Sequence, residues 1–239
     1  MSGETRSNEP RNHLLSHLAC ADLALLQRYL EPVALKFRQQ LETANHTIRH
    51  AYFIERGIAS VVATANGQRR QAEIAIVGRE GMTGLAVVLG TDRSPHNTFV
   101  QIEGEGQCIA ADDLQRAMGE SGSLAATLTR YAQVFLIQAS CSALANAQGK
   151  IEERLARWLL MAHDRVESND LHLTHEFLAA MLGVRRAGVT TALHQLESQA
   201  LIAMGRGSIT VIDREGLEEN ANGLYGVPEA EFKRLFPVN

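Results

Sequence analysis

Several features that would narrow the function of a 239-residue chain are scarce here. Only three cysteines occur, Cys20, Cys108 and Cys141, and none belongs to a CxxC pair. An odd number of widely spaced cysteines argues against a disulfide framework and favours reduced thiols in a cytoplasm. No apolar run approaches the roughly 18 residues of a membrane span, and the polar start MSGETRSNEPRN has no apolar signal core. We therefore expect a cytoplasmic protein without membrane contacts.

Basic charge is also in short supply. Lys and Arg number 23 against 27 Asp and Glu, so the formal net charge is -4. Any contact with nucleic acid must therefore come from a local basic patch rather than from the field of the whole molecule. The hydrophobic content of 45% suffices for two modest cores, and domains commonly have about 100 to 150 residues, so two domains are expected.

The N-terminal half has the texture of a β-rich body. Residues 1–12 are polar and predict a disordered tail, and the leucines that follow predict short helices broken at Pro32. From residue 51 to residue 110, short runs rich in Val, Ile and Phe alternate with turn residues, and Asn66-Gly67 is the best hairpin turn. This pattern predicts an antiparallel β-roll of the jelly-roll type over residues 13–120, hence an α+β fold.

Residues 121–148 predict one long helix, because the 26 residues from Ser123 to Gln148 contain neither Gly nor Pro. Apolar and small side chains recur along it at alternating steps of four and three, which predicts a seam for pairing with a second copy. A helix that packs only on its own domain is the alternative. The seam residues are Leu124, Leu128, Tyr131, Phe135, Gln138, Ser142 and Ala145.

A lone glycine, Gly183, divides the amphipathic pattern of the C-terminal part. A small residue, Ala179, lies four positions earlier, and apolar residues flank the glycine, as in two helices that cross steeply at a tight turn. Thr174 is placed to cap a first helix from His175 to Leu182, and a second would run from Arg186 to Ser198. These features predict a helix-turn-helix; an αα-hairpin within a core is the alternative.

The sequence ALIAMGRGSITVID then predicts a β-hairpin with Arg206 at its tip. Helices and hairpin together predict a winged helix-turn-helix over residues 149–220, followed by a C-terminal extension over residues 221–239. The second helix would enter a major groove, and arginines at its start would supply the local positive charge. The candidate DNA-binding residues are Thr174, Arg185, Arg186, Thr190, Thr191, His194 and Arg206.

The order of these parts resembles the Crp/Fnr family of bacterial transcription regulators. The segments LTHEFLAAMLGVRRAGVTTALHQLESQALIAMGRGSITVIDREGLE and VGREGMTG carry the resemblance most specifically. It implies a cyclic-nucleotide-binding-like β-roll, a homodimer across the long helix, and a DNA-binding regulator of palindromic operators rather than an enzyme. The implied partners are double-stranded DNA, a second copy and RNA polymerase.

The family pattern is incomplete at the effector pocket and at the recognition helix. Where cyclic-nucleotide-binding members carry an Arg-Ser pair, this chain has His96 and Asn97, so a cyclic phosphate would lose its guanidinium partner. We expect an effector other than cyclic AMP, unless Arg93 and Ser94 take the place of that pair. Ala187 and Thr191 replace two base-reading residues, which predicts a changed half-site. The expected effector pocket comprises Glu80, Gly81, Gly84, His96 and Asn97.

Other sensing modes and functions have less support. An iron-sulfur cluster needs several N-terminal cysteines, whereas Cys20 stands alone, and no histidine pair has the further ligands of a metal site. We therefore expect no catalytic residue, metal or cofactor, only an unidentified small-molecule effector. Haem, which needs one axial histidine, a ligand-free sensor domain, and a cupin-like metal-dependent enzyme remain the alternatives.

Overall fold

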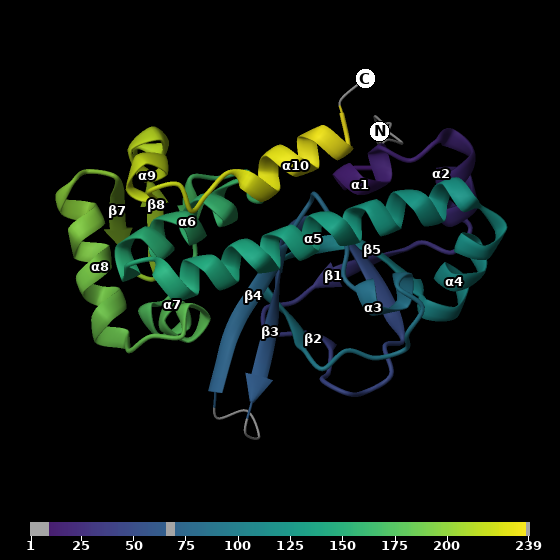
Figure 1. The fold of residues 1–239 in the computed structure, drawn as a ribbon, viewed down its shortest axis with the longest axis horizontal. Coiled ribbons are helices and arrows are strands. Elements are labelled where there is room, and N and C mark those ends of the chain that lie inside the picture. The colour runs from purple at the N-terminus through teal and green to yellow at the C-terminus, as the bar shows by residue number, and fades with distance from the viewer. Residues whose placement is uncertain (1–9, 66–69, 238–239) are drawn as a thin grey trace, which may run out of the picture.

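The computed structural model describes residues 10–65 and 70–237 of the chain (Figure 1). A β-sheet body, one long helix and a small helical domain follow one another along the chain (Figure 1). The strands are β1 (Glu31–Leu35), β2 (Gln40–Glu42), β3 (His50–Ala65), β4 (Arg70–Val77), β5 (Asn97–Ala110), β6 (Asp170–Leu171), β7 (Ile202–Gly205) and β8 (Ser208–Val211). The helices are α1 (His13–Ser16), α2 (Cys20–Gln27), α3 (Leu85–Val88), α4 (Ala111–Glu120), α5 (Gly122–Gln148), α6 (Ile151–His163), α7 (His175–Leu182), α8 (Arg186–Ser198), α9 (Arg214–Asn220) and α10 (Val227–Leu235).

The N-terminal sheet confirms the predicted antiparallel β body. Its strand order is β1-β5-β3-β4, with β2 also paired to β5. The long strands β3 and β5 pair along most of their length, and three register shifts bend the pair into a roll. The Asn66-Gly67 turn lies outside the described residues, but the flanking strands β3 and β4 pair antiparallel.

Two N-terminal segments differ from expectation. Pro32 does not end a helix but lies in β1, which pairs with β5 at the edge of the sheet, where a strand tolerates a missing N–H. Asn12, expected at the end of the tail, is completely buried. Its side chain donates hydrogen bonds to the carbonyls of Ile54, at 2.7 Å, and Gly81, at 2.8 Å. The chain is therefore anchored to the roll from this residue onward.

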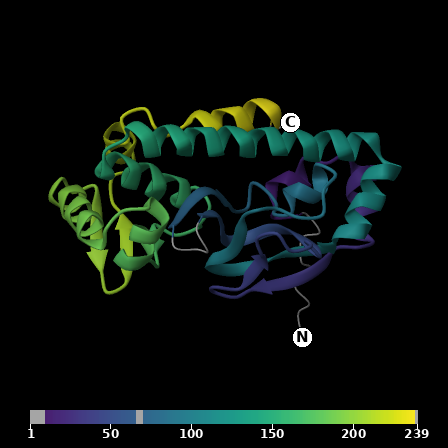
Figure 2. The same cartoon turned by 60° about the horizontal axis from the view of Figure 1, so that its bottom comes forward.

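Helix α5 runs the length of the molecule, over the roll and on to the C-terminal domain (Figure 2). Ser121 caps its N-terminus by accepting a hydrogen bond from the Leu124 amide. The face expected to pair with a second copy is turned inward: Leu124, Leu128 and Tyr131 pack in the core of the roll, with α3 and α4 close by. Gln138 is also buried, and its side-chain oxygen accepts the Ile76 amide at 2.7 Å. The structure therefore agrees with the alternative for this face, in which the helix packs on its own domain.

The C-terminal extension folds back along α5 as α10, so that the two helices lie side by side (Figures 1 and 2). Phe232 and Phe236 stack at 4.9 Å between ring centroids, and His17, directly after α1, meets both rings edge-on. The extension therefore ties the end of the C-terminal domain to the N-terminal body.

The roll and the C-terminal domain share a core. Ile58 and Ile76 of the roll belong to the same apolar cluster as the buried residues of α6, α7 and α8. At its edge, the Trp158 indole donates a hydrogen bond to the Glu73 carboxylate at 2.6 Å. Burial raises the pKa of Glu73 to about 7, although hydrogen bonds from Ser60 and Trp158 favour its ionised form. Among the described residues, no helix is long and apolar enough to cross a membrane.

Candidate nucleic-acid interface

The corner between α7 and α8 has the geometry expected from its sequence. The two helices have the predicted bounds, and the Thr174 hydroxyl caps α7 by accepting a hydrogen bond from the Phe177 amide at 3.2 Å. Gly183 adopts φ 64° and ψ 32°, a left-handed conformation that a side chain with a Cβ disfavours. The chain therefore turns from α7 into α8 at Gly183, the first of the three residues that connect the two helices.

Apolar residues hold this corner on the rest of the domain. Leu178 and Ala179 of α7 are buried against Val189 and Leu193 of α8, and α6 packs across both helices. Because the inner side of α8 is fixed in this core, its outer side is a rigid, solvent-facing surface.

A three-stranded sheet of order β6-β8-β7 completes a winged helix-turn-helix. Gly205 pairs with Ser208, so Arg206 and Gly207 form a two-residue turn, and Gly207 has φ 77°. Arg206 is exposed at this tip, as the sequence predicted.

The predicted contact residues divide into two groups. Arg185, Arg186, Thr191, His194 and Arg206 are exposed, and the first turn of α8 carries no acidic residue. Thr174 and Thr190 have local roles as well: Thr174 caps α7, while Thr190 is half-buried with its hydroxyl 3.1 Å from Nδ1 of His175.

One exposed polar residue on this face escaped the sequence analysis. Gln195 is exposed next to His194 and lies four residues after Thr191, one helical turn along the same side. The spacing of Thr191 and Gln195 was the available signal. The side-chain amide of Gln195 can both donate and accept hydrogen bonds, so this residue is suited to reading base edges.

The residues expected to form an effector pocket lie in two different environments. Glu80 forms a buried ion pair with Arg165, at 2.8 Å from Nη2. Gly81 lies against the Tyr131 ring, where a Cβ would overlap the phenol. Asn97, in contrast, accepts the Ala44 amide at 3.0 Å, and the His96 amide donates to the Ser94 hydroxyl at 3.2 Å.

Gly84 is held by the buried carboxyl group of Glu42. It adopts φ 78°, and its amide donates to Oε1 of the buried Glu42 at 2.7 Å. Burial raises the pKa of Glu42, whereas hydrogen bonds from the Gly84 amide, Thr98 and Thr83 favour its ionised form. The chain thus places its own carboxyl group at the start of α3. Among the described residues, no group of three or more His, Cys, Asp or Glu side chains is arranged to hold a metal ion.

A β-roll, a long helix and a winged helix-turn-helix follow one another in the order found in Crp-like proteins. Residues 153–220 match the family described as the Crp-like helix-turn-helix domain. The resemblance to Crp/Fnr transcription regulators is therefore confirmed, by sequence in the C-terminal domain and by fold along the chain. No match is found among curated proteins.

Three solved structures illustrate the likeness in fold. FixK2 from Bradyrhizobium japonicum is 17% identical with a TM-score of 0.69, covering 80% of this chain and 96% of that one. A CRP-family transcriptional regulator from Thermus thermophilus is 18% identical with a TM-score of 0.65, covering 81% and 97%. The c-di-GMP responsive global regulator CLP from Xanthomonas campestris is 14% identical with a TM-score of 0.63, covering 81% and 99%.

Proposed function

We propose that the protein is a sequence-specific DNA-binding regulator that acts as a homodimer on a palindromic operator. One observation carries the proposal: α8 presents an exposed polar and basic face, free of acidic residues in its first turn, on a winged helix-turn-helix. With 13 residues, α8 is about 20 Å long, and a helix of this kind fits the major groove, which is about 12 Å wide.

The place of each residue in α8 and in the wing indicates which part of the DNA it would contact. Arg186 begins α8 and is a candidate for guanine, while Thr191, His194 and Gln195 are exposed further along the helix. Arg206 would reach the phosphate backbone from the wing, and Arg185 from the start of the helix. The proposal therefore separates residues that select the sequence from residues that only add affinity.

A second copy would pair along the outer face of α5, opposite to the buried seam. Six exposed residues recur there at alternating steps of four and three, the spacing of a two-stranded coiled coil. Leu136 is 59% exposed in the middle of this outer face, and Leu144 is 49% exposed beside its end. The outer face comprises Thr129, Gln133, Leu136, Ser140, Ala143 and Ala147.

Sedimentation equilibrium tests this pairing. Leu136→Glu places two like charges opposite each other at the centre of the paired outer faces, so we expect the dimer to dissociate, with the far-ultraviolet circular dichroism unchanged. Leu89→Glu is the control, because Leu89 is equally exposed at 63% but lies outside α5. A dimer that persists in Leu136→Glu would contradict pairing along this face.

We propose further that the effector is not cyclic AMP and that the chain is no enzyme, works in the cytoplasm and contacts RNA polymerase. Glu42 supports the first point: its side-chain oxygen already accepts the Gly84 amide, so a phosphate at that amide would have to displace this carboxyl group. His96 cannot replace a guanidinium, because burial lowers its pKa and favours the neutral ring.

Selection of bound duplexes from a random pool tests the proposed function. The wild-type protein is expected to enrich one palindrome with half-sites centred about 10 base pairs apart. Arg186→Ala should lose preference at one base of each half-site, while Arg206→Ala should keep the preference and bind more weakly. No enrichment by the wild type, with or without added cyclic nucleotides, would contradict the proposal.

A further inference from the structure

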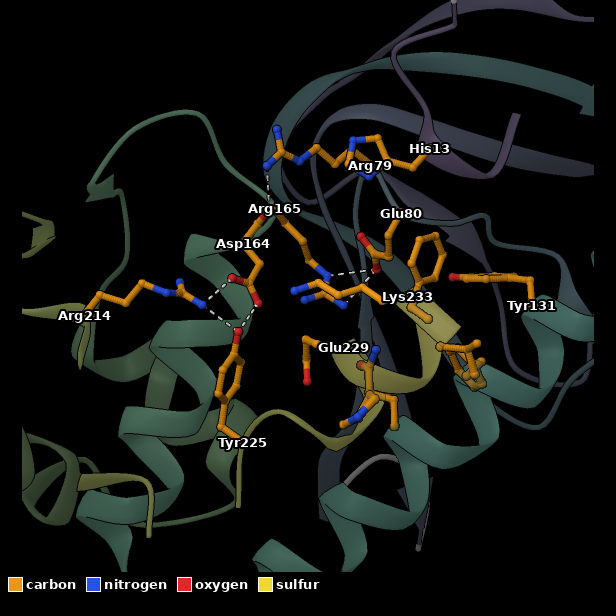
Figure 3. Close-up of a pocket in the computed structure, with 15 residues that line it drawn as sticks. His13, Arg79, Glu80, Tyr131, Asp164, Arg165, Arg214, Tyr225, Glu229 and Lys233 are labelled. Carbon is orange, nitrogen blue, oxygen red and sulfur yellow. Dashed lines mark hydrogen bonds and ion pairs between the residues drawn. The ribbon is translucent and has the colours of Figure 1, made fainter. Parts of the chain in front are cut away.

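A cavity of about 250 Å³ lies between the two domains (Figure 3). The segment after β4 bounds it with Arg79 and Glu80, the end of α6 with Asp164 and Arg165, and α10 closes it. Apolar and aromatic side chains from α5 and α10 line another part of the wall: Tyr131, Val134, Phe135, Pro228 and Phe232. The volume equals the liquid-state share of about eight water molecules, enough for an organic molecule of roughly ten non-hydrogen atoms.

Two buried polar groups on this wall lack partners. Among the described residues, neither side-chain oxygen of Glu229 has a hydrogen-bond partner, and neither does Nε of Arg79. Burial raises the pKa of Glu229, although Arg165 opposes the shift. A buried polar group without a partner typically costs about 1 to 3 kcal/mol, so both groups favour a ligand that completes them.

Among the described residues, two cations on this wall make no ion pair. Arg165 pairs with Glu80 and Arg214 with Asp164, each at 2.8 Å (Figure 3), and Arg214 also pairs with Glu218, outside the cavity, at 3.1 Å. The two cations are Arg79, whose Nη2 donates to the Asp164 carbonyl at 3.0 Å, and the exposed Lys233. Desolvation lowers the pKa of His13, so this ring adds no further positive charge near neutral pH. A negatively charged ligand in the cavity would therefore meet two cations that no acidic side chain holds.

We propose that this cavity binds a small aromatic monocarboxylate that also carries a hydrogen-bond donor. The carboxylate would accept from Arg79 and Lys233, the donor would bond to Glu229, and the ring would lie against the apolar wall. The carboxylate supplies the acidic partner that Arg79 and Lys233 lack, and the donor supplies the hydrogen bond that the Glu229 oxygens lack.

Isothermal titration calorimetry on the full chain, with three aromatic probes of similar size, separates the contribution of the carboxylate from that of the hydrogen-bond donor. 4-Hydroxyphenylacetate has both functions, phenylacetate lacks the donor, and 4-ethylphenol lacks the carboxylate. We expect 4-hydroxyphenylacetate to bind at least tenfold more tightly than either. Equal affinities for all three, or no binding of 4-hydroxyphenylacetate, would overturn the proposal.

Substitutions on α10 assign the two functions to residues. Lys233→Met should lower the affinity for both carboxylates and leave the affinity for 4-ethylphenol unchanged. Glu229→Met should make the affinity for 4-hydroxyphenylacetate equal to that for phenylacetate. Arg234→Met is the control, because it removes a positive charge from the same helix at a side chain that is 65% exposed and paired with Glu231. A loss of affinity in Arg234→Met equal to that in Lys233→Met would refute the assignment.

Such a ligand would touch the roll, α5 and the C-terminal domain together, which suits an effector that shifts one domain against another. Only this regulatory role rests on the proposed function. Calorimetry and duplex binding are therefore measured separately: duplex binding without ligand binding overturns the site, and ligand binding without duplex binding overturns the proposed function.

Discussion

The buried Glu73 couples the stability of the chain to pH in a direction that can be worked out. Its pKa lies at about 7 in the folded chain against an ordinary value of 4.5, because burial disfavours the ionised form. Below pH 4.5 the carboxyl group is protonated in both states and contributes no pH dependence. Between these two values the unfolded chain loses the proton while the folded chain keeps it, so the free energy of unfolding falls as pH rises.

The expected size follows from the shift. One pKa unit corresponds to about 1.4 kcal/mol, so the difference between 4.5 and about 7 gives a loss of roughly 3 kcal/mol by pH 8. Glu73→Gln removes the titration but keeps an oxygen that can accept from the Trp158 indole. We therefore expect the variant to gain roughly 3 kcal/mol over the wild type between pH 4.5 and pH 8.

Urea denaturation of both proteins at several pH values measures this difference. Glu42 and Glu229, whose pKa values burial also raises, are present in both proteins and cancel in the comparison. Glu120→Gln, an exposed change in α4, controls for the loss of one negative charge. A difference between wild type and Glu73→Gln that stays constant over this pH range would refute the reasoning.

Three further predictions concern the corner, the roll and the wing. Gly183→Ala should lower the free energy of unfolding in urea by about 1 kcal/mol, because Gly183 has a positive φ. Gly119→Ala, at an open position in α4, is the control and should not destabilise the chain, so equal effects of the two substitutions would contradict this prediction. Gly81→Ala should cost about 1 to 3 kcal/mol, because its Cβ would overlap Tyr131, and an unchanged urea midpoint would disprove the contact. Arg206→Ala should reduce the slope of log affinity against log salt by about 1, while an unaltered slope would remove Arg206 from the phosphate contacts.

The helix-turn-helix could be predicted from sequence because local physics determines it. A capping Thr174, a small Ala179 and a left-handed Gly183 lie within ten residues, and each has a distinct conformational role. Both helices therefore have the predicted bounds.

The faces of α5 could not be assigned in the same way. Two series of residues on opposite sides of this helix have the same alternating spacing, and the more apolar series was expected to pair with a second copy. The structure buries Leu124, Leu128 and Tyr131 of that series in their own domain, because the roll needs an apolar cover. Periodicity shows that a face is buried but does not identify its partner.

Long-range contacts also escaped prediction. Nothing in the local sequence shows that Asn12 reaches two carbonyls of the roll, or that Glu229 closes a cavity beside Arg79 and Arg165. The C-terminal extension has ordinary helical patterning, so its docking on α5 depends on side chains more than 90 residues away.

If two copies joined along the outer face of α5 present their α8 helices to successive major grooves, the affinity for DNA must depend on the spacing between the half-sites. The measurement is the affinity of the dimer for the selected palindrome and for the same duplex with about five base pairs, half a helical turn, inserted at its centre. We predict that the insertion weakens binding at least tenfold, because the second α8 then faces the wrong side of the duplex. Equal affinity for the two duplexes would contradict a rigid dimer that reads two half-sites.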